Sequence, residues 1–119
     1  MKKTVVLGAS PNSSRYSNKA VKRLVSNDFE AIPVGVRQGI IEGIDIITET
    51  PFIRNVHTIT LYINPERQKS YYNYILSLQP ERIIFNPGTE NTELMQLAQE
   101  KKIEVSVACT LVLLAVGEY

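Results

Sequence analysis

The sequence predicts a three-layer α/β fold, in which helices cover both faces of a five-stranded parallel sheet. Short apolar runs rich in β-branched residues recur along the chain, and segments with helical periodicity separate them. The connections between them are short, so each helix returns the chain to a strand parallel to the previous one. The chain has 119 residues, 44% of them apolar, which suffices for one domain with its own core. We therefore expect a single Rossmann-type domain over residues 1–119.

Each predicted strand is a short apolar run. The five runs are Thr4–Leu7, Phe29–Val34, Thr58–Ile63, Arg82–Phe85 and Glu104–Val107. Pro33 lies near the end of the second run, where its missing N–H costs least. Residues 35–56 are expected to be irregular, apart from one short strand at Ile44–Ile47. The apolar run Cys109–Val116 fits a short buried helix or a strand equally well.

Three helices are predicted between these strands, each from an N-terminal signal and an apolar stripe. Ser17 is the predicted N-cap of the first, because its hydroxyl can accept from free first-turn amides. The second begins at Asn64-Pro65-Glu66, where asparagine caps, proline fits the first turn and glutamate favours the positive helix end. Its expected apolar face consists of Tyr71, Tyr72, Ile75 and Leu76. Asn91 caps the third helix.

Composition excludes several classes of protein. The 13 Lys and Arg nearly balance the 12 Asp and Glu, which argues against a strongly basic nucleic-acid binder. A single cysteine excludes a disulfide framework within the chain and fits a reducing cytosol. The apolar run after Lys3 stops at Gly8, so we expect no export signal. The longest apolar stretch, Val107–Val116, is about half of the ~20 residues that span a bilayer, so we expect no membrane partner.

Positive charge is concentrated near the N-terminus. Residues 1–27 carry six basic side chains and no acid. This asymmetry indicates a local anion site. An alternative for three of these side chains is a solvated helix face: Lys19, Lys22 and Arg23.

The loop after the first strand has the composition of a phosphate site. Residues 8–15 offer backbone amides, small polar side chains and Arg15 at a helix N-terminus. Ligands of open parallel sheets bind beyond the carboxyl ends of the strands, where the strand order reverses. Gly8, Ala9, Ser10 and Arg15 are therefore candidate binding residues. The alternative is a Ser/Asn-rich turn that only caps the helix.

Two further loops place Asn-Pro directly after a strand, at Asn64-Pro65 and at Asn86-Pro87. Helix capping alone accounts for Asn64. Asn86 is a stronger ligand candidate, because Asn91 already caps the helix that follows it. Gly88 permits close backbone approach or a positive φ.

A nicotinamide dinucleotide site is disfavoured. Such a site normally shows G-x-G-x-x-G and an acid at the end of the second strand. Here that strand ends in Pro33-Val34-Gly35-Val36-Arg37, which contains no acid. Arg37 suits a phosphorylated ribose.

Catalytic and metal-binding residues are scarce. His57, the one histidine, precedes the third strand and is expected at the opposite edge of the sheet. Cys109 lies in an apolar run without an activating neighbour, which favours an inert buried thiol. Ser10 has no base near it. No cluster of histidine, cysteine or carboxylate indicates a metal site, so we expect no catalysis.

The sequence also resembles a known family. Four segments carry the resemblance: Leu7-Gly8-Ala9-Ser10, Tyr62-Ile63-Asn64-Pro65-Glu66-Arg67-Gln68, Phe85-Asn86-Pro87-Gly88-Thr89-Glu90-Asn91 and Ala108-Cys109-Thr110-Leu111. Together with Arg15, they resemble the stand-alone CoA-binding-domain proteins of bacteria. The fold of that family is similar to the N-terminal, CoA-binding domain of the succinyl-CoA synthetase α subunit. Its short members have no established reaction.

The resemblance implies that coenzyme A, free or as an acyl-CoA, is the ligand. The pyrophosphate would contact the first loop, at Gly8, Ala9, Ser10 and Arg15. Val34 and Arg37 would lie by the adenosine and its 3′-phosphate. Many relatives have Val-Asn-Pro where this chain has Val34-Gly35-Val36.

The resemblance also implies roles for the next two loops. Ile63, Asn64 and Pro65 would flank the adenine or the pantetheine, and Asn86 and Gly88 match the family motif. The larger synthetases keep their phosphorylated histidine in a second domain, which has no counterpart here.

We therefore expect a domain that binds CoA without a reaction of its own. One alternative is a small enzyme or sensor that uses another adenine nucleotide, such as NADP or AMP. Another is a structural subunit that requires a catalytic partner. The sequence leaves open a homodimer or a protein partner.

Overall fold

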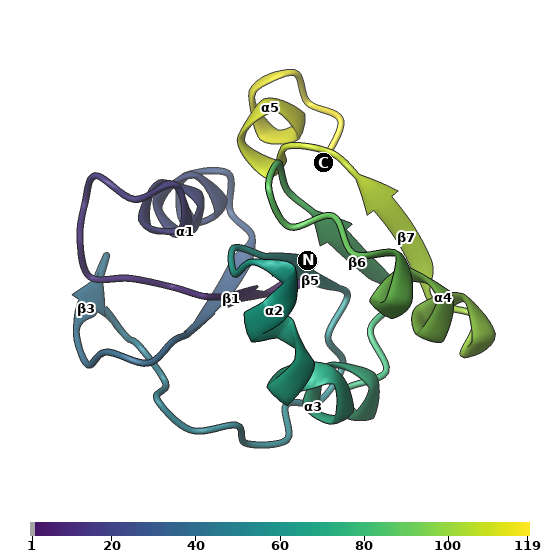
Figure 1. The fold of residues 1–119 in the computed structure, drawn as a ribbon. Helices are drawn as coiled ribbons and strands as arrows, with labels where there is room; N and C mark the ends of the chain where they lie inside the picture. The colour runs from purple at the N-terminus through teal and green to yellow at the C-terminus, as the bar shows by residue number, and fades with distance from the viewer. Residues whose placement is uncertain (1) are drawn as a thin grey trace.

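The computed structural model describes residues 2–119 and has the predicted three-layer α/β, Rossmann-like fold (Figure 1). All neighbouring strands of its five-stranded sheet are parallel, in the order β2-β1-β5-β6-β7. The strands are β1 (Lys3–Leu7), β2 (Glu30–Val34), β5 (Thr58–Leu61), β6 (Arg82–Phe85) and β7 (Glu104–Val107). Each overlaps a predicted strand. Pro33 is tolerated in β2 because β2 is an edge strand.

The strand order reverses between β1 and β5. From β1 the chain crosses to β2 on one side, and β5 then pairs with the other side of β1. The register aligns Leu7 with Val34 and with Leu61, and Leu61 with Phe85. The loops that follow these four residues therefore emerge at one edge of the sheet, on both sides of the reversal point.

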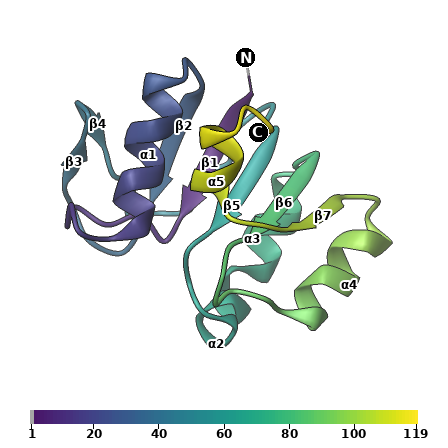
Figure 2. The same cartoon turned by 90° about the horizontal axis from the view of Figure 1, so that it is seen from above.

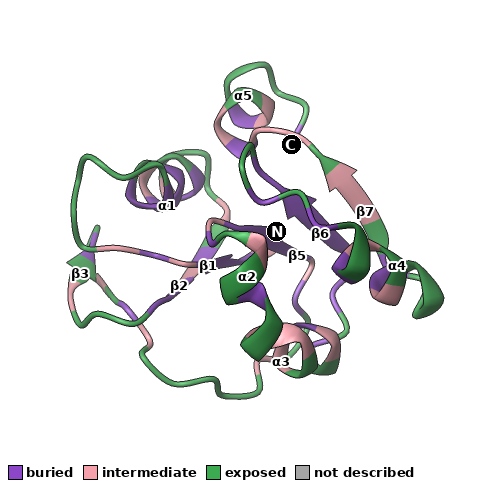
Figure 3. Cartoon of the chain, in the orientation of Figure 1, coloured by how far each residue is buried: buried purple, intermediate pink, exposed green. Residues whose placement is uncertain are grey.

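Helices cover both faces of the sheet (Figure 2). On one face lie α1 (Tyr16–Ser26) and α5 (Thr110–Ala115), where Leu24 and Leu114 pack with Val6. The other face is covered by α2 (Pro65–Gln68), η1 (Lys69–Tyr71), α3 (Tyr72–Ser77) and α4 (Thr92–Glu100). The central strands β5 and β6 are buried along their whole length (Figure 3), as expected for a parallel sheet with helices on both faces.

The first helix begins earlier than predicted. Its N-cap residue is Arg15, which makes no side-chain capping hydrogen bond, and Ser17 is buried inside the first turn. A turn centred on Asn12 brings the chain into the helix. Asn12 Oδ1 accepts from the Ser14 N–H at 3.0 Å, and the Asn12 carbonyl accepts from the Arg15 N–H at 3.1 Å. The prediction of Ser17 as N-cap is therefore wrong.

Residues 35–56 contain a hairpin that the sequence analysis did not predict. The strands β3 (Ile40–Ile41) and β4 (Ile44–Asp45) pair antiparallel, and Glu42 and Gly43 between them both have positive φ. This is the backbone twist that two-residue hairpin turns require. The predicted strand Ile44–Ile47 is therefore shorter, although Ile47 still bridges to Val34 at the end of β2.

Two other segments differ in detail from the prediction. The helix after Asn64 is divided into α2, η1 and α3, and of its predicted apolar face only Ile75 is fully buried. The undecided run Cys109–Val116 forms the short helix α5. Among residues 2–119 no helix is long and apolar enough to cross a bilayer.

Candidate functional site

A cavity of about 630 Å³ opens at the carboxyl edge of the sheet. The loops that follow β1, β2, β5 and β6 line it, so it lies where the strand order reverses. Most of the sequence-predicted site residues meet there: Gly8, Ala9, Ser10, Arg15, Arg37, Ile63, Asn64 and Gly88.

Close backbone approach holds the first loop in place. Gly8 has φ +98°, and a Cβ on it would lie 2.8 Å from Ile63 Cγ2. The N–H groups of Gly8 and Ala9 both donate to the Val34 carbonyl, at 2.8 and 2.9 Å. These two amides are therefore already bonded and are not the free phosphate donors that the sequence analysis expected.

The N-terminus of α1 supplies free donors instead. The first amides of a helix have no partner within the helix, and Arg15 does not cap them with its side chain. Arg15, Tyr16 and Ser17 line the cavity, so this helix end faces it. The helix dipole and the Arg15 guanidinium together favour a bound anion at this wall.

The loop after β2 touches the first loop. A Cβ on Gly35 would lie 2.2 Å from the Ala9 carbonyl oxygen, so no side chain fits at this position. This close contact explains why glycine occupies position 35. Val34 is buried in the core and does not line the cavity. The three residues that follow Val34 do line the cavity: Gly35, Val36 and Arg37.

Asn86 and Pro65 have structural roles. The Asn86 side-chain amide donates to the Leu61 carbonyl at 2.8 Å, and its Oδ1 accepts from the Thr110 N–H at 2.8 Å. Both ends of this buried side chain are thus engaged in joining β5 to α5. Pro65 is the first residue of α2. Neither residue lines the cavity.

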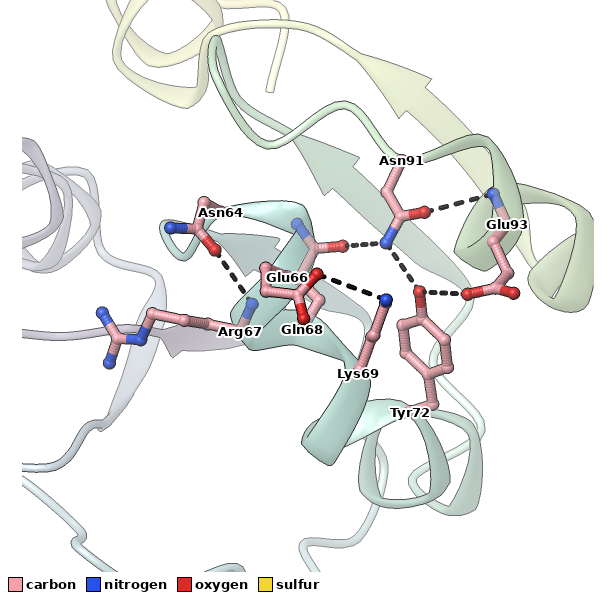
Figure 4. Close-up of polar contacts among 8 residues, drawn as sticks. All are labelled: Asn64, Glu66, Arg67, Gln68, Lys69, Tyr72, Asn91 and Glu93. Atoms are coloured by element: carbon pink, nitrogen blue, oxygen red, sulfur yellow. Dashed lines mark hydrogen bonds and ion pairs between the residues drawn. The ribbon is translucent and has the colours of Figure 1, made fainter.

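Three arginines line the cavity: Arg15, Arg37 and Arg67. Within residues 2–119 no acidic side chain lines it. Glu66, next to Arg67, pairs instead with Lys69 at 3.2 Å, and Figure 4 shows Arg67 pointing away from that pair. In the described part of the chain this is the one ion pair, so all three guanidinium groups lack an acidic partner. The cavity therefore carries uncompensated positive charge.

Sequence reasoning missed Arg67. Its N–H donates to the capping Asn64 Oδ1 at 2.9 Å, which places it three residues beyond the N-cap of α2. The sequence shows that Arg67 lies three residues after Asn64. The direction of the Arg67 side chain, however, depends on the orientation of α2 relative to the sheet.

A buried glutamine joins two of the cavity loops, and Figure 4 shows its hydrogen bond with Asn91. Gln68 is fully buried, and its Nε2 donates to the Ile63 carbonyl at 2.9 Å and to the Thr89 carbonyl at 2.8 Å. Its Oε1 accepts from Asn91, which also donates to the Tyr72 hydroxyl. Since Ile63 and Thr89 both line the cavity, Gln68 fixes the distance between the loops after β5 and β6.

Several other lining side chains that were not predicted from the sequence are aromatic or apolar. Tyr16 and Val36 are 69% and 65% exposed at the cavity. Tyr71 lines it from η1. The Tyr62 hydroxyl is buried without a hydrogen-bond partner among the described residues, and burial raises the pKa of Tyr62 to about 12.

His57 and Cys109 lie outside the cavity lining. His57 precedes β5 at the opposite edge of the sheet, where its N–H donates to the Lys3 carbonyl and its Nδ1 bonds Thr58 Oγ1 at 2.7 Å. Burial lowers the pKa of His57. Cys109 is only half-buried, directly before α5. The described residues contain no group of three His, Cys, Asp or Glu placed to hold a metal ion.

The sequence of this chain matches the model of a known protein family. The family model described as "CoA binding domain" matches residues 2–115. The chain belongs to the CoA binding domain family. A search of curated proteins found no match.

Solved structures share the fold of this chain. The crystal structure of an uncharacterized protein has 54% identity, covers 100% of this chain and 98% of its own, and gives a TM-score of 0.98. A hypothetical protein from Pyrococcus horikoshii OT3 has 22% identity, with coverage of 93% and 80% and a TM-score of 0.83. A conserved hypothetical protein from Pyrococcus furiosus has 25% identity, with coverage of 89% and 92% and a TM-score of 0.78.

Proposed function

We propose that this CoA binding domain binds coenzyme A or an acyl-CoA in the cavity at the carboxyl edge of its sheet. The observation that carries the proposal is the set of three arginines without acidic partners, next to the uncapped N-terminus of α1. CoA is a polyanion with a pyrophosphate and a 3′-phosphate, and guanidinium groups bind phosphate through paired charge-assisted hydrogen bonds. The cavity volume of about 630 Å³ is within the ordinary range of ligand sites.

The walls suggest an orientation for the ligand. The pyrophosphate binds at Arg15 and the first turn of α1, and the 3′-phosphate binds at Arg37. The exposed side chains of Tyr16 and Val36 both line the cavity and offer apolar surfaces to the adenine. The pantetheine then extends toward Asn64 and the loop after β6.

The same lining supports binding without catalysis. Among the described residues that form the cavity there is no histidine, cysteine or carboxylate to act as nucleophile or general base. The Tyr62 hydroxyl, with a pKa of about 12, stays protonated at neutral pH and is a poor proton acceptor. We therefore propose a binding domain that delivers or senses CoA for another protein.

Calorimetric titration with CoA, acetyl-CoA, NADP and AMP tests the proposal. CoA and acetyl-CoA are expected to bind more tightly than NADP or AMP. In a thermal-shift experiment, a ligand present at 100 times its Kd stabilises the fold by about 2.7 kcal/mol. Preference for NADP or AMP would favour the nucleotide enzyme or sensor instead, and no binding of CoA at millimolar concentration would refute the proposal. Mass spectrometry of any ligand that co-purifies with the native protein provides an independent identification.

A further inference from the structure

The helix α5 is apolar on all sides, yet it is only partly enclosed. Its sequence from Thr110 to Ala115 is TLVLLA, and Val116 follows. Thr110 and Leu114 are buried, whereas Val112 and Val116 are 56% and 62% exposed. Figure 3 shows that α5 contains both buried and exposed residues. A helix that is apolar all round is ordinarily surrounded by protein or lipid. An exposed apolar side of this kind marks an interaction surface.

A hollow of about 300 Å³ separates this side of α5 from α1, and we call it the α1–α5 groove. Its apolar wall consists of Leu111, Val112 and Ala115. Its other wall consists of Lys19, Lys22 and Arg23, which share one face of α1 because they are three and four residues apart. In the part of the chain that the structure describes, none of these three cations has an ion-pair partner.

The groove is separate from the proposed CoA site. The CoA cavity uses Arg15, Tyr16 and Ser17 in the first turn of α1, whereas the groove uses the turns that follow. No residue lines both. Lys19 Nζ lies 5.4 Å from the centroid of the Tyr16 ring, at the boundary between the two sites. Lys22 and Arg23 line only the groove, so the phosphates of CoA do not explain them.

Charge and shape select among the possible occupants. A twofold contact centred on the groove would bring the two sets of three cations close together at the symmetry axis, and like charges across an interface are unfavourable. A bilayer surface is contacted by a projecting apolar face, whereas these apolar side chains line a hollow. The groove instead combines an apolar wall with a positive rim, which complements an amphipathic helix with acidic residues beside its apolar stripe.

We propose that the α1–α5 groove binds an acidic amphipathic helix of a partner protein. The apolar stripe of that helix packs on Leu111, Val112 and Ala115, and its carboxylates pair with Lys19, Lys22 and Arg23. This inference rests on the proposed function, in which the domain delivers or senses CoA for another protein.

Two synthetic amphipathic peptides of about 18 residues test the proposal. Both carry leucine on the apolar face, and the polar face carries glutamate in one and lysine in the other. The acidic peptide is expected to bind the ¹⁵N-labelled chain and to shift the amide resonances of residues 19–23 and 111–116. The lysine peptide is expected not to bind. Added salt is expected to weaken the acidic complex.

Matched variants locate the contact. The double variant Lys19→Glu/Arg23→Glu is expected to weaken binding of the acidic peptide by roughly tenfold or more, because both attractions become repulsions. The control Arg54→Glu/Lys101→Glu has the same change in charge at exposed positions outside the groove. It is expected to leave the affinity within about twofold. Thermal melting followed by circular dichroism confirms that both variants fold.

Several results would overturn the proposal. The first is that the acidic peptide does not bind at millimolar concentration. The second is that the lysine peptide binds equally well. The third is that the amide resonances that shift belong only to residues outside the groove. Sedimentation velocity that shows a dimer abolished by Lys19→Glu/Arg23→Glu would assign the groove to self-association. Co-sedimentation with vesicles of phosphatidylcholine and phosphatidylglycerol, without peptide binding, would assign it to a membrane. None of these results bears on CoA binding, which the ligand titration measures separately.

Discussion

At the scale of single residues, Arg37 and Arg15 come from different loops and are expected to contact different phosphates of CoA. Dephospho-CoA lacks only the 3′-phosphate, so the ratio of the two affinities isolates the group that binds it. Arg37→Ala is expected to weaken CoA by about 1.5–3 kcal/mol, roughly tenfold to hundredfold in Kd, and dephospho-CoA much less. Arg15→Ala is expected to weaken both ligands alike. Calorimetry that shows an unchanged affinity ratio in Arg37→Ala would place the adenosine elsewhere.

Arg67 supplies positive charge to the cavity from α2. Arg67→Gln keeps a polar side chain but removes the charge. It is expected to lower the affinity for CoA by roughly tenfold, since a hydrogen bond to a charged group contributes about 1.5–3 kcal/mol. Arg54→Gln, outside the cavity, serves as the matched control for the loss of one charge. If both variants bind CoA with equal affinity, Arg67 has no specific contact with the ligand.

Gly35 is required because its α-carbon lies against the first loop. A Cβ there would meet the Ala9 carbonyl oxygen at 2.2 Å, and both groups belong to the backbone. Gly35→Ala is expected to cost about 1–3 kcal/mol of unfolding free energy, as overpacking does elsewhere, and to distort the cavity. Asn73→Ala, at an exposed position of α3, is the control. Equal urea midpoints for the two variants would show that the loops separate easily.

At the scale of elements, Gln68 joins the loop after β5 to the loop after β6. Gln68→Leu keeps most of the side-chain volume but leaves the buried acceptors of Ile63 and Thr89 without a donor. The expected loss is about 1–3 kcal/mol for each buried group left unsatisfied. Urea denaturation measures this loss, with Gln99→Leu on the exposed side of α4 as control. Hydrogen exchange is expected to accelerate in both loops, and unchanged exchange would contradict the role assigned to Gln68.

At the scale of the whole molecule, Tyr119 packs across segments distant in sequence. Its ring lies 5.0 Å from the Phe29 ring and 4.6 Å from the Arg82 guanidinium carbon, and its hydroxyl bonds Thr4. Tyr119→Ala is expected to destabilise the fold by about 3–5 kcal/mol, as truncation of a buried aromatic does. Tyr119→Phe keeps the ring and is expected to cost only about 1 kcal/mol. Equal thermal midpoints for the two variants would show that the ring contributes nothing.

Local patterns sufficed for most of the fold. β-Branched runs such as Thr58–Leu61 predict a buried strand from their own composition, and Asn64 and Asn91 cap the helices after them as predicted. These signals depend on a few neighbouring residues, so they can be recognised in the sequence without knowledge of the tertiary structure. The hairpin at Glu42-Gly43 also has a local signal, the glycine in its turn. Its strands contain only two paired residues each, which is too short for an apolar pattern to predict them. The start of α1 was misplaced because the Asn12 turn, and not Ser17, brings the chain into the helix.

The sequence by itself determined the α/β class, the order of the strands along the chain and the loops that form the cavity. Periodicity, capping and charge asymmetry are local properties, which is why they can be read without coordinates. Only the tertiary structure decided that the amides of Gly8 and Ala9 are occupied, that Asn86 faces α5, and that Arg67 joins Arg15 and Arg37. Those facts depend on how separate loops approach one another at the sheet edge. A contact between distant segments is set by the packing of the whole chain, and no single segment encodes it.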